Sequence, residues 1–275
     1  MQTITNNTKD RKNNKMLKFN GTSTGLFWKG SPRMIAFDPA GIEEKINNLE
    51  KPIYAVRDFS GRVGLTNDGS VESTGPGLEL LMLREPMRPE QLGDPTFRQD
   101  YGLRYAYKTG AMANGIASED LVIAMGQAGL LGSFGAAGLV PKRVLAAIEK
   151  IQSALPTQSY AFNLIHSPNE PALEAGAVQL FLEHGVKVVE ASAFLGLTAN
   201  IVHYRVAGLS KSADGKIIIE NKVIAKVSRK EVAARFMQPA PQNFLDELLA
   251  AGKITNEQAN PVSYTHLTLP TIYSV

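Results

Sequence analysis

Short apolar runs alternate with longer segments of helical periodicity from residue 119 onward. The runs are LVIAM (121–125), AFNLI (161–165), VKVVE (186–190) and KVIAKV (222–227). Each run is followed by a segment whose apolar residues recur at helical intervals, which is the spacing of βα units. The pattern therefore predicts four consecutive βα units and an α/β fold with a parallel sheet, either open or closed into a barrel.

The expected helices begin at sequence signals. Pro141 opens the first helix, because proline is favoured at the first helical position. Ser167–Glu170 and Ser228–Glu231 have the spacing of a capping box and predict two further helix starts. The helix after Ser167 is expected to bury four residues at helical intervals, namely Leu173, Ala177, Leu180 and His184. A helix near 198–206 and a hairpin turning at Asp214-Gly215 separate the third strand from the fourth.

The pattern is weaker before residue 119. Residues 1–16 are polar and basic and are predicted to be disordered. Residues 17–118 are assigned to a small β-containing region and a connector, with strands at IYAVRD (53–58) and VGL (63–65). The βα units are assigned to 119–260.

Composition excludes several classes of protein. The chain is 44% hydrophobic and 20% charged, which is typical of a globular protein. Its 29 Lys and Arg against 26 Asp and Glu give a net charge of +3, which indicates no nucleic-acid partner. The lack of cysteine excludes disulfides and thiolate chemistry, and no metal site is assigned. No apolar run approaches the roughly 20 residues of a membrane span. A cytoplasmic protein is the expectation.

Glycine recurs at every third position after the first apolar run. The residues are Gly126, Gly129, Gly132, Gly135 and Gly138. The dinucleotide-binding pattern G-x-G-x-x-G is absent, which argues against a Rossmann fold. Two alternatives remain: a loop whose backbone approaches a ligand, or close packing of a helix on the sheet.

Asn163 is a polar residue inside an apolar strand. Alternation places it on one face with Ala161 and Ile165. A buried amide without partners costs a few kcal/mol, so it should bond either a ligand's polar edge or neighbouring backbone. His166, which comes directly after the strand, is either a contact of the site or a solvated loop residue. Ser167 is expected to cap a helix rather than act as a nucleophile.

Lys226 also lies inside an apolar strand, where an isolated ammonium is costly. Three alternatives are open. The lysine pairs with a carboxylate such as Glu190, forms a Schiff base, or stabilises negative charge on a bound cofactor.

Several long segments are similar to one known family. They are YGLRYAYKTGAMANGIASEDLVIAMGQAGLLGSFGAAGL (101–139), FNLIHSPNEPALE (162–174), VEASAFLGLT (189–198), YRVAGL (204–209) and NKVIAKVSRKEVA (221–233). Together they resemble the PfaD-type enoyl reductases of polyunsaturated fatty acid and polyketide synthesis, which are related to the nitronate monooxygenases. The resemblance covers about residues 95–259.

The resemblance implies a (β/α)8 barrel that binds FMN at the carboxyl ends of its strands. It implies that hydride passes from NADPH through FMN to an enoyl chain on an acyl carrier protein. Met125 and Gly126 would lie against the isoalloxazine, Asn163 would bond the ring's polar edge, and Lys226 would lie near its pyrimidine end. Glu190, a candidate partner of Lys226, completes the expected cofactor-binding set. The catalytic proton donor is not assigned.

The chain departs from this family in two respects. Four βα units make only the first half of a barrel, and the strand-seven and strand-eight loops that usually hold the cofactor phosphate are missing. The last fifteen residues (261–275) contain no Lys, Arg, Asp or Glu and are expected to be a non-native tail. The chain is therefore expected to be truncated, with poor FMN binding and little turnover. The alternatives are a nitronate-oxidising flavoprotein and a non-catalytic docking subunit of a synthase; an oligomer is compatible with each.

Overall fold

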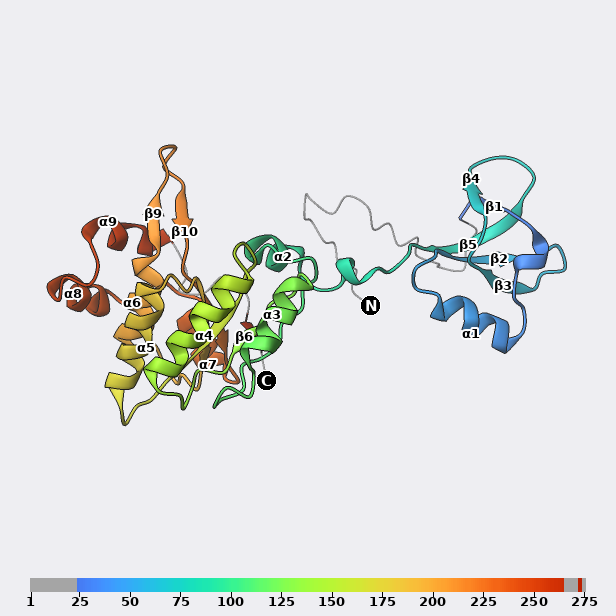
Figure 1. Ribbon diagram of the computed structural model, residues 1–275. Coiled ribbons are helices and arrows are strands. Elements are labelled where there is room, and N and C mark those ends of the chain that lie inside the picture. Colours follow the sequence, from blue (N-terminus) through green and yellow to red (C-terminus); the bar gives the residue numbers. More distant parts are fainter. Residues whose placement is uncertain (1–23, 265–271, 274–275) are drawn as a thin grey trace. The chain divides into compact units, whose positions relative to one another are not determined.

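The computed structural model describes residues 24–264 and 272–273 (Figure 1). The chain divides into two compact units, with the boundary between Leu92 and Gly93. The predicted disorder of residues 1–16 lies outside the described residues. No helix in the described part is long and apolar enough to cross a membrane.

The first unit is built on a five-stranded antiparallel sheet of order β3-β2-β5-β1-β4. Its elements are β1 (Phe27–Lys29), α1 (Pro39–Asn47), β2 (Ile53–Arg57), β3 (Val63–Thr66), β4 (Ser70–Glu72) and β5 (Leu78–Arg84). The strands predicted from IYAVRD and VGL are present as β2 and β3. Trp28, Val56 and Leu80 are almost fully buried in its core. The Trp28 indole N–H donates to Asp68 O at 2.9 Å, so the buried ring keeps a hydrogen bond.

The second unit contains a parallel sheet of order β12-β11-β8-β7-β6. Its elements are α2 (Pro95–Tyr101), α3 (Glu119–Gln127), β6 (Ser133–Phe134), α4 (Pro141–Ala154), β7 (Ala161–Ile165), α5 (Pro171–Glu183), β8 (Val188–Ser192), α6 (Ala199–Ala207), β9 (Leu209–Lys211), β10 (Ile217–Ile219), β11 (Lys222–Lys226), α7 (Lys230–Phe236), α8 (Gln242–Ala250), α9 (Asn256–Ala259) and β12 (Ile272–Tyr273). The predicted α/β fold with a parallel sheet is confirmed, as is the hairpin, which forms between β9 and β10.

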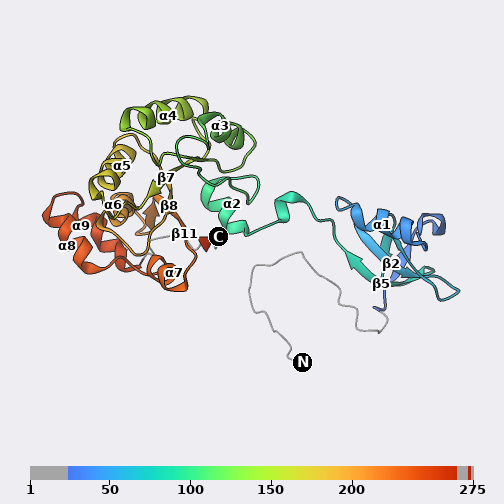
Figure 2. The ribbon, with the colours of Figure 1, turned by 90° about the horizontal axis from the view of Figure 1, so that it is seen from below.

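Helices cover the two faces of this sheet unequally. In Figure 2, α3, α4, α5, α8 and α7 follow one another around strands β7, β8 and β11, while α2 lies on the other side. On the α2 side, Ala161, Val188 and Ile224 pack with two aromatic residues of α2, Phe97 and Tyr101. Because side chains alternate along a strand, the next residues on this face are Asn163, Glu190 and Lys226. The face is thus apolar at the level of Ala161, Val188 and Ile224 and polar at the next level toward the carboxyl ends of the strands.

The prediction of a strand at LVIAM (121–125) is wrong, because this run lies inside helix α3. Ser118 caps the helix by accepting a hydrogen bond from Leu121 N at 3.3 Å, and two acidic residues occupy the first turn. Val122 and Met125 are buried on one side of the helix. An apolar run of five residues fits either element, and here the capping signal decides for helix. The first βα unit instead uses the short strand β6.

The two predicted capping boxes are also wrong. Helix α5 begins at Pro171 and helix α7 at Lys230, and neither has a side-chain cap. Helix α5 buries Glu174, Val178 and Phe181 most fully, and of the predicted stripe Ala177 and Leu180 are partly buried against the main core. Leu173, the first residue of that stripe, is 58% exposed.

The described carboxyl-terminal residues pack within the second unit. Val262 is buried in the main core, and β12 pairs with β11 through Ala225↔Ile272 and Lys226↔Tyr273. Strand β11 is therefore paired along this edge over two residues. Residues 265–271 and 274–275 of the expected non-native tail lie outside the described residues, and the origin of that tail stays a prediction.

The glycines after α3 face protein rather than open space. A Cβ on Gly126 would lie 2.5 Å from Leu155 Cδ1, and one on Gly132 would lie 2.6 Å from Val122 Cα. A Cβ on Gly135 would lie only 1.6 Å from the carbonyl oxygen of Met112. Of the two alternatives for the glycine repeat, close packing is the one that these three positions support.

Gly135→Ala is expected to lower the free energy of unfolding by about 2 kcal/mol, because the added methyl group would force the Met112 backbone away. Chemical denaturation followed by circular dichroism measures the change. Gly176→Ala is the matched control, since a Cβ there meets no atom within 4 Å and α5 should gain about 0.5–1 kcal/mol. Equal stabilities of the Gly135 variant and the unmodified protein would contradict the packing argument.

Candidate functional site

A charged cluster lies on the polar part of the α2 face, with Glu190 at its centre. One carboxylate oxygen, Oε2, accepts a hydrogen bond from Lys108 Nζ. The other, Oε1, pairs with Lys226 Nζ at 2.8 Å and accepts a hydrogen bond from Ala111 N at 3.1 Å. The side chain of Glu190 is fully buried, that of Lys108 is 9% exposed and that of Lys226 is 28% exposed. Two ammonium groups share one carboxylate, so these three residues together carry a net positive charge.

The sheet brings the three charged residues together. Glu190 of β8 lies beside Ile224 of β11, two residues before Lys226 on the same face. Lys108 belongs to a segment that forms an isolated parallel bridge with Leu131, next to β6. The ion pair between Lys226 and Glu190, one of three alternatives offered from the sequence, is confirmed.

Lys108 was missed as a site residue. The signal was present in YAYKTGAMA (105–113), where one lysine stands among aromatic and small residues. The bridge is too short to produce a strand pattern, and its partner lies 23 positions further along the chain. Only the folded sheet shows that this lysine faces Glu190.

Asn163 uses its amide nitrogen within the protein. Nδ2 donates to Glu190 O at 3.1 Å and to Ser192 Oγ at 2.8 Å, so bonding to neighbouring backbone is confirmed. Because a carbonyl oxygen only accepts, this contact fixes which end of the amide is nitrogen. Oδ1 makes no hydrogen bond to the described residues, and Asn163 lines a cavity of about 410 Å³. An acceptor on a largely buried side chain is thus available to a ligand.

Opposing effects set the pKa of Glu190. Burial raises the pKa of this carboxyl, but attraction by Lys108 and hydrogen bonds from Lys108 and Lys226 outweigh burial, so the net pKa lies below its ordinary value. Glu190 is therefore ionised at neutral pH and holds both lysines in place.

A second polar network joins the loops that follow β7 and β8. Glu174 of α5 is buried and accepts hydrogen bonds from Thr198 Oγ1 and, at 2.9 Å, from the His166 ring at Nδ1. The His166 ring stacks on Phe194 with a centroid distance of 5.1 Å. His166 is therefore held in place rather than solvated. Ser167 caps no helix of the described chain, because α5 begins four residues later.

Met125 and Gly126 do not join the charged cluster. Both lie in α3 rather than at a strand end, and Gly126 faces Leu155. Their contact with a cofactor stays a prediction, but they do not lie at the strand end where it was expected. His203 is buried in α6 near Lys253 O, and burial lowers its pKa, whereas His184 ends α5.

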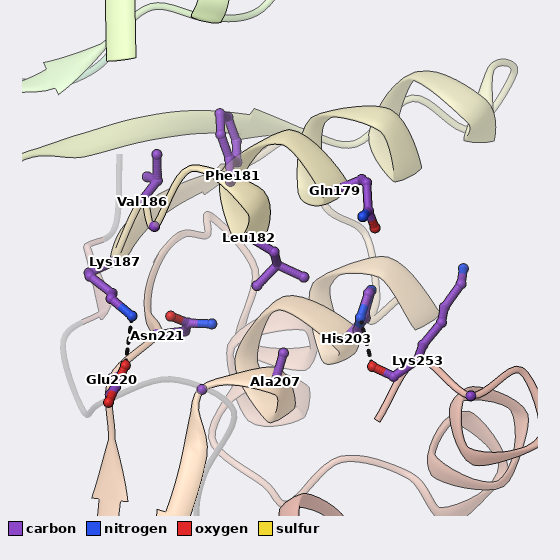
Figure 3. A pocket seen from close by; sticks show the side chains of 13 residues that line it. Gln179, Phe181, Leu182, Val186, Lys187, His203, Ala207, Glu220, Asn221 and Lys253 are labelled. Carbon is purple, nitrogen blue, oxygen red and sulfur yellow. Dashed lines mark hydrogen bonds and ion pairs between the residues drawn. The ribbon is translucent and has the colours of Figure 1, made fainter. Parts of the chain in front are cut away.

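Another cavity, of about 460 Å³, lies at the opposite ends of the strands (Figure 3). Lys187 and Glu220, which precede β8 and β11, form an exposed ion pair of 2.6 Å at its edge. The cavity therefore lies away from the charged cluster. Among the described residues, no group of three or more His, Asp or Glu side chains could hold a metal ion.

Comparison with known proteins places this α/β chain among relatives of fatty acid and polyketide synthase components. It is 46% identical over 239 residues to a polyunsaturated fatty acid synthase subunit of Thraustochytrium sp., covering 84% of this chain and 15% of that protein. It is 44% identical over 171 residues to polyketide biosynthesis protein PksE of Bacillus subtilis, covering 62% of this chain and 22% of that protein. The chain thus spans less than a quarter of the length of either relative.

A solved structure is also similar. It is the enoyl reductase domain of MlnA from the macrolactin biosynthesis cluster of Bacillus amyloliquefaciens, with TM-score 0.63 and 38% sequence identity. The similarity covers 65% of this chain and 41% of that one. Residues 28–86 match the family described as fatty acid synthase subunit PfaD N-terminal domain. The resemblance to the PfaD-type proteins that was stated from the sequence is confirmed by this family match and these relatives.

Proposed function

We propose that the protein of which this chain is a part, or the whole, is an FMN-dependent enoyl reductase acting in trans on enoyl chains attached to an acyl carrier protein. The similarity to an enoyl reductase domain supports this reaction class, and the similarity to synthase components supports carrier-bound substrates in fatty acid or polyketide synthesis. The second unit would form half of a (β/α)8 barrel. The single observation that carries the proposal is the charged cluster of Lys108, Glu190 and Lys226 at the carboxyl ends of parallel strands.

The residues of the cluster fit an electron-rich ring. Negative charge gathers at the pyrimidine end of a reduced flavin, and a fixed cation stabilises it better than mobile water does. The net positive charge of the cluster supplies that cation. Asn163 Oδ1 supplies an acceptor for a ring N–H, since its Nδ2 is already engaged.

The two lysines would have different tasks. Lys108 is the less exposed and would hold the Glu190 carboxylate in place. Lys226 is more exposed and would present its ammonium group to the ring. When bound, FMN would supply the transfer of hydride from NADPH to the enoyl double bond. The protein's own residues would orient the ring and stabilise its charge.

Titration of the full-length protein with FMN, followed by flavin fluorescence, tests the cofactor. NADPH oxidation that depends on an enoyl thioester is the expected activity of an FMN-loaded protein. Oxygen uptake with alkyl nitronates in its place would indicate a nitronate monooxygenase. Absence of FMN binding by the folded protein would contradict the proposal and favour a docking subunit.

A further inference from the structure

Helix α5 carries two apolar stripes, and the second packs only in part on the core. Val178 and Phe181 are buried in the main core. Leu173, Ala177 and Leu180 lie on a different side of the helix, where they line the cavity of about 410 Å³ that also reaches Asn163. Ala177 and Leu180 are partly buried against the main core, whereas Leu173 is 58% exposed, so core packing does not account for Leu173.

The cavity runs between α4 and α5. Leu139, Val140 and Val144 contribute apolar side chains from its other wall, and Ile165 contributes one from the end of β7. Small residues of α5 leave it open, since a Cβ on Gly176 would meet no atom within 4 Å. The polar residues of its lining are Asn163, Ser167 and Glu174, which lie at or after the carboxyl end of β7.

Three large apolar side chains are exposed around this cavity: Val140 at 66%, Leu173 at 58% and Ile165 at 39%. Contiguous exposed apolar surface marks a binding site more often than it occurs by chance. A slot with apolar walls and a polar end suits a ligand with a hydrocarbon body and a polar head. The volume lies within the range of small-molecule sites.

We propose that this cavity binds the hydrocarbon part of a fatty acyl thioester, with the thioester end toward Asn163. The inference rests on the proposed function, because the reducible double bond of an enoyl thioester lies beside the thioester carbonyl. The apolar stripe of α5 would then determine which chain lengths are accepted.

Binding of butanoyl-, octanoyl- and dodecanoyl-coenzyme A to the 275-residue protein, measured by calorimetry, tests the site. Each methylene taken into the cavity is expected to tighten binding by about fourfold until the cavity is full. Leu173→Asp should weaken dodecanoyl binding by about tenfold or more without changing the melting temperature, because the side chain is exposed. Leu49→Asp is the matched control, since Leu49 is an exposed leucine of the first unit and should leave binding unchanged.

FMN titration of the full-length protein, alongside the thioester measurements, separates the two proposals. FMN binding together with equal affinities for the three thioesters would overturn the acyl site alone. Chain-length dependence without FMN binding would support the acyl site and overturn the proposed cofactor. An equal loss of dodecanoyl binding in the Leu173 and Leu49 variants would show non-specific adsorption and overturn the site.

Discussion

Glu190→Gln is expected to lower the free energy of unfolding by about 3–5 kcal/mol, which is the usual cost of removing one partner from a buried ion pair. The glutamine keeps the shape of the side chain but not its charge. Lys108 and Lys226 would then repel each other in a poorly solvated position, and the hydrogen bond from Ala111 N would lose its charged acceptor. Urea denaturation at neutral pH measures the loss.

Glu220→Gln is the matched control for this change. Glu220 also pairs with a lysine, Lys187, but both side chains are more than half exposed. Exposed pairs contribute about 0–1 kcal/mol, so the control should unfold almost as the unmodified protein does. A loss for the Glu190 variant no larger than that of the control would show that the cluster contributes nothing to stability.

The charged cluster also predicts that the free energy of unfolding decreases in acid. The pKa of Glu190 is lower in the folded protein than in the unfolded chain. Its contribution to the free energy of unfolding is therefore complete above the ordinary pKa of the carboxyl, and it is lost as the pH falls through the pKa of the folded state. In the Glu190→Gln variant this part of the acid destabilisation should be absent.

The sequence predicted the parallel α/β fold because three of the four strands are long enough to show their own pattern. AFNLI coincides with β7, and the third and fourth runs overlap β8 and β11. The first strand could not be found in this way. Strand β6 has two residues inside a glycine-rich stretch, and the more conspicuous apolar run beside it is helix α3.

The candidate site was predictable only in part, for a related reason. Asn163, Glu190 and Lys226 stand out because each is polar inside an apolar strand. Lys108 belongs to no recognisable strand, and its role depends on a contact with a residue 82 positions away. Met125 and Gly126 were assigned to the site by the family resemblance, at the end of an expected first strand where the structure has helix α3. The local sequence pattern thus identifies polar residues within strands. Residues that join a site only through long-range contacts can be identified only once the fold is known.

In the full-length protein, Lys226→Met is expected to weaken FMN binding by about 10–100-fold, because it removes the ammonium group proposed to face the ring. The estimate is the value of a hydrogen bond to a charged group, about 1.5–3 kcal/mol. Lys108 and Glu190 would remain as a neutral pair, so the fold should survive. Fluorescence titration with FMN measures the affinity, and thermal unfolding verifies the fold.

The reduction potential of bound FMN distinguishes the loss of the ammonium charge from a change in the shape of the site. A cation near the pyrimidine end favours the negatively charged reduced form, so Lys226→Met should lower the reduction potential of bound FMN. Each additional tenfold loss of affinity for reduced over oxidised FMN corresponds to about 30 mV for a two-electron couple.

Lys222→Met is the control for position. Lys222 lies on the same face of β11, at its amino end, where its ammonium group bonds Asp100 O rather than the charged cluster. This variant should bind FMN within about twofold of the unmodified protein, because the proposed ring site lies at the other end of the strand. Equal losses of affinity in the two lysine variants would attribute the effect to net charge, and unchanged affinity and potential in Lys226→Met would remove this lysine from the proposed site.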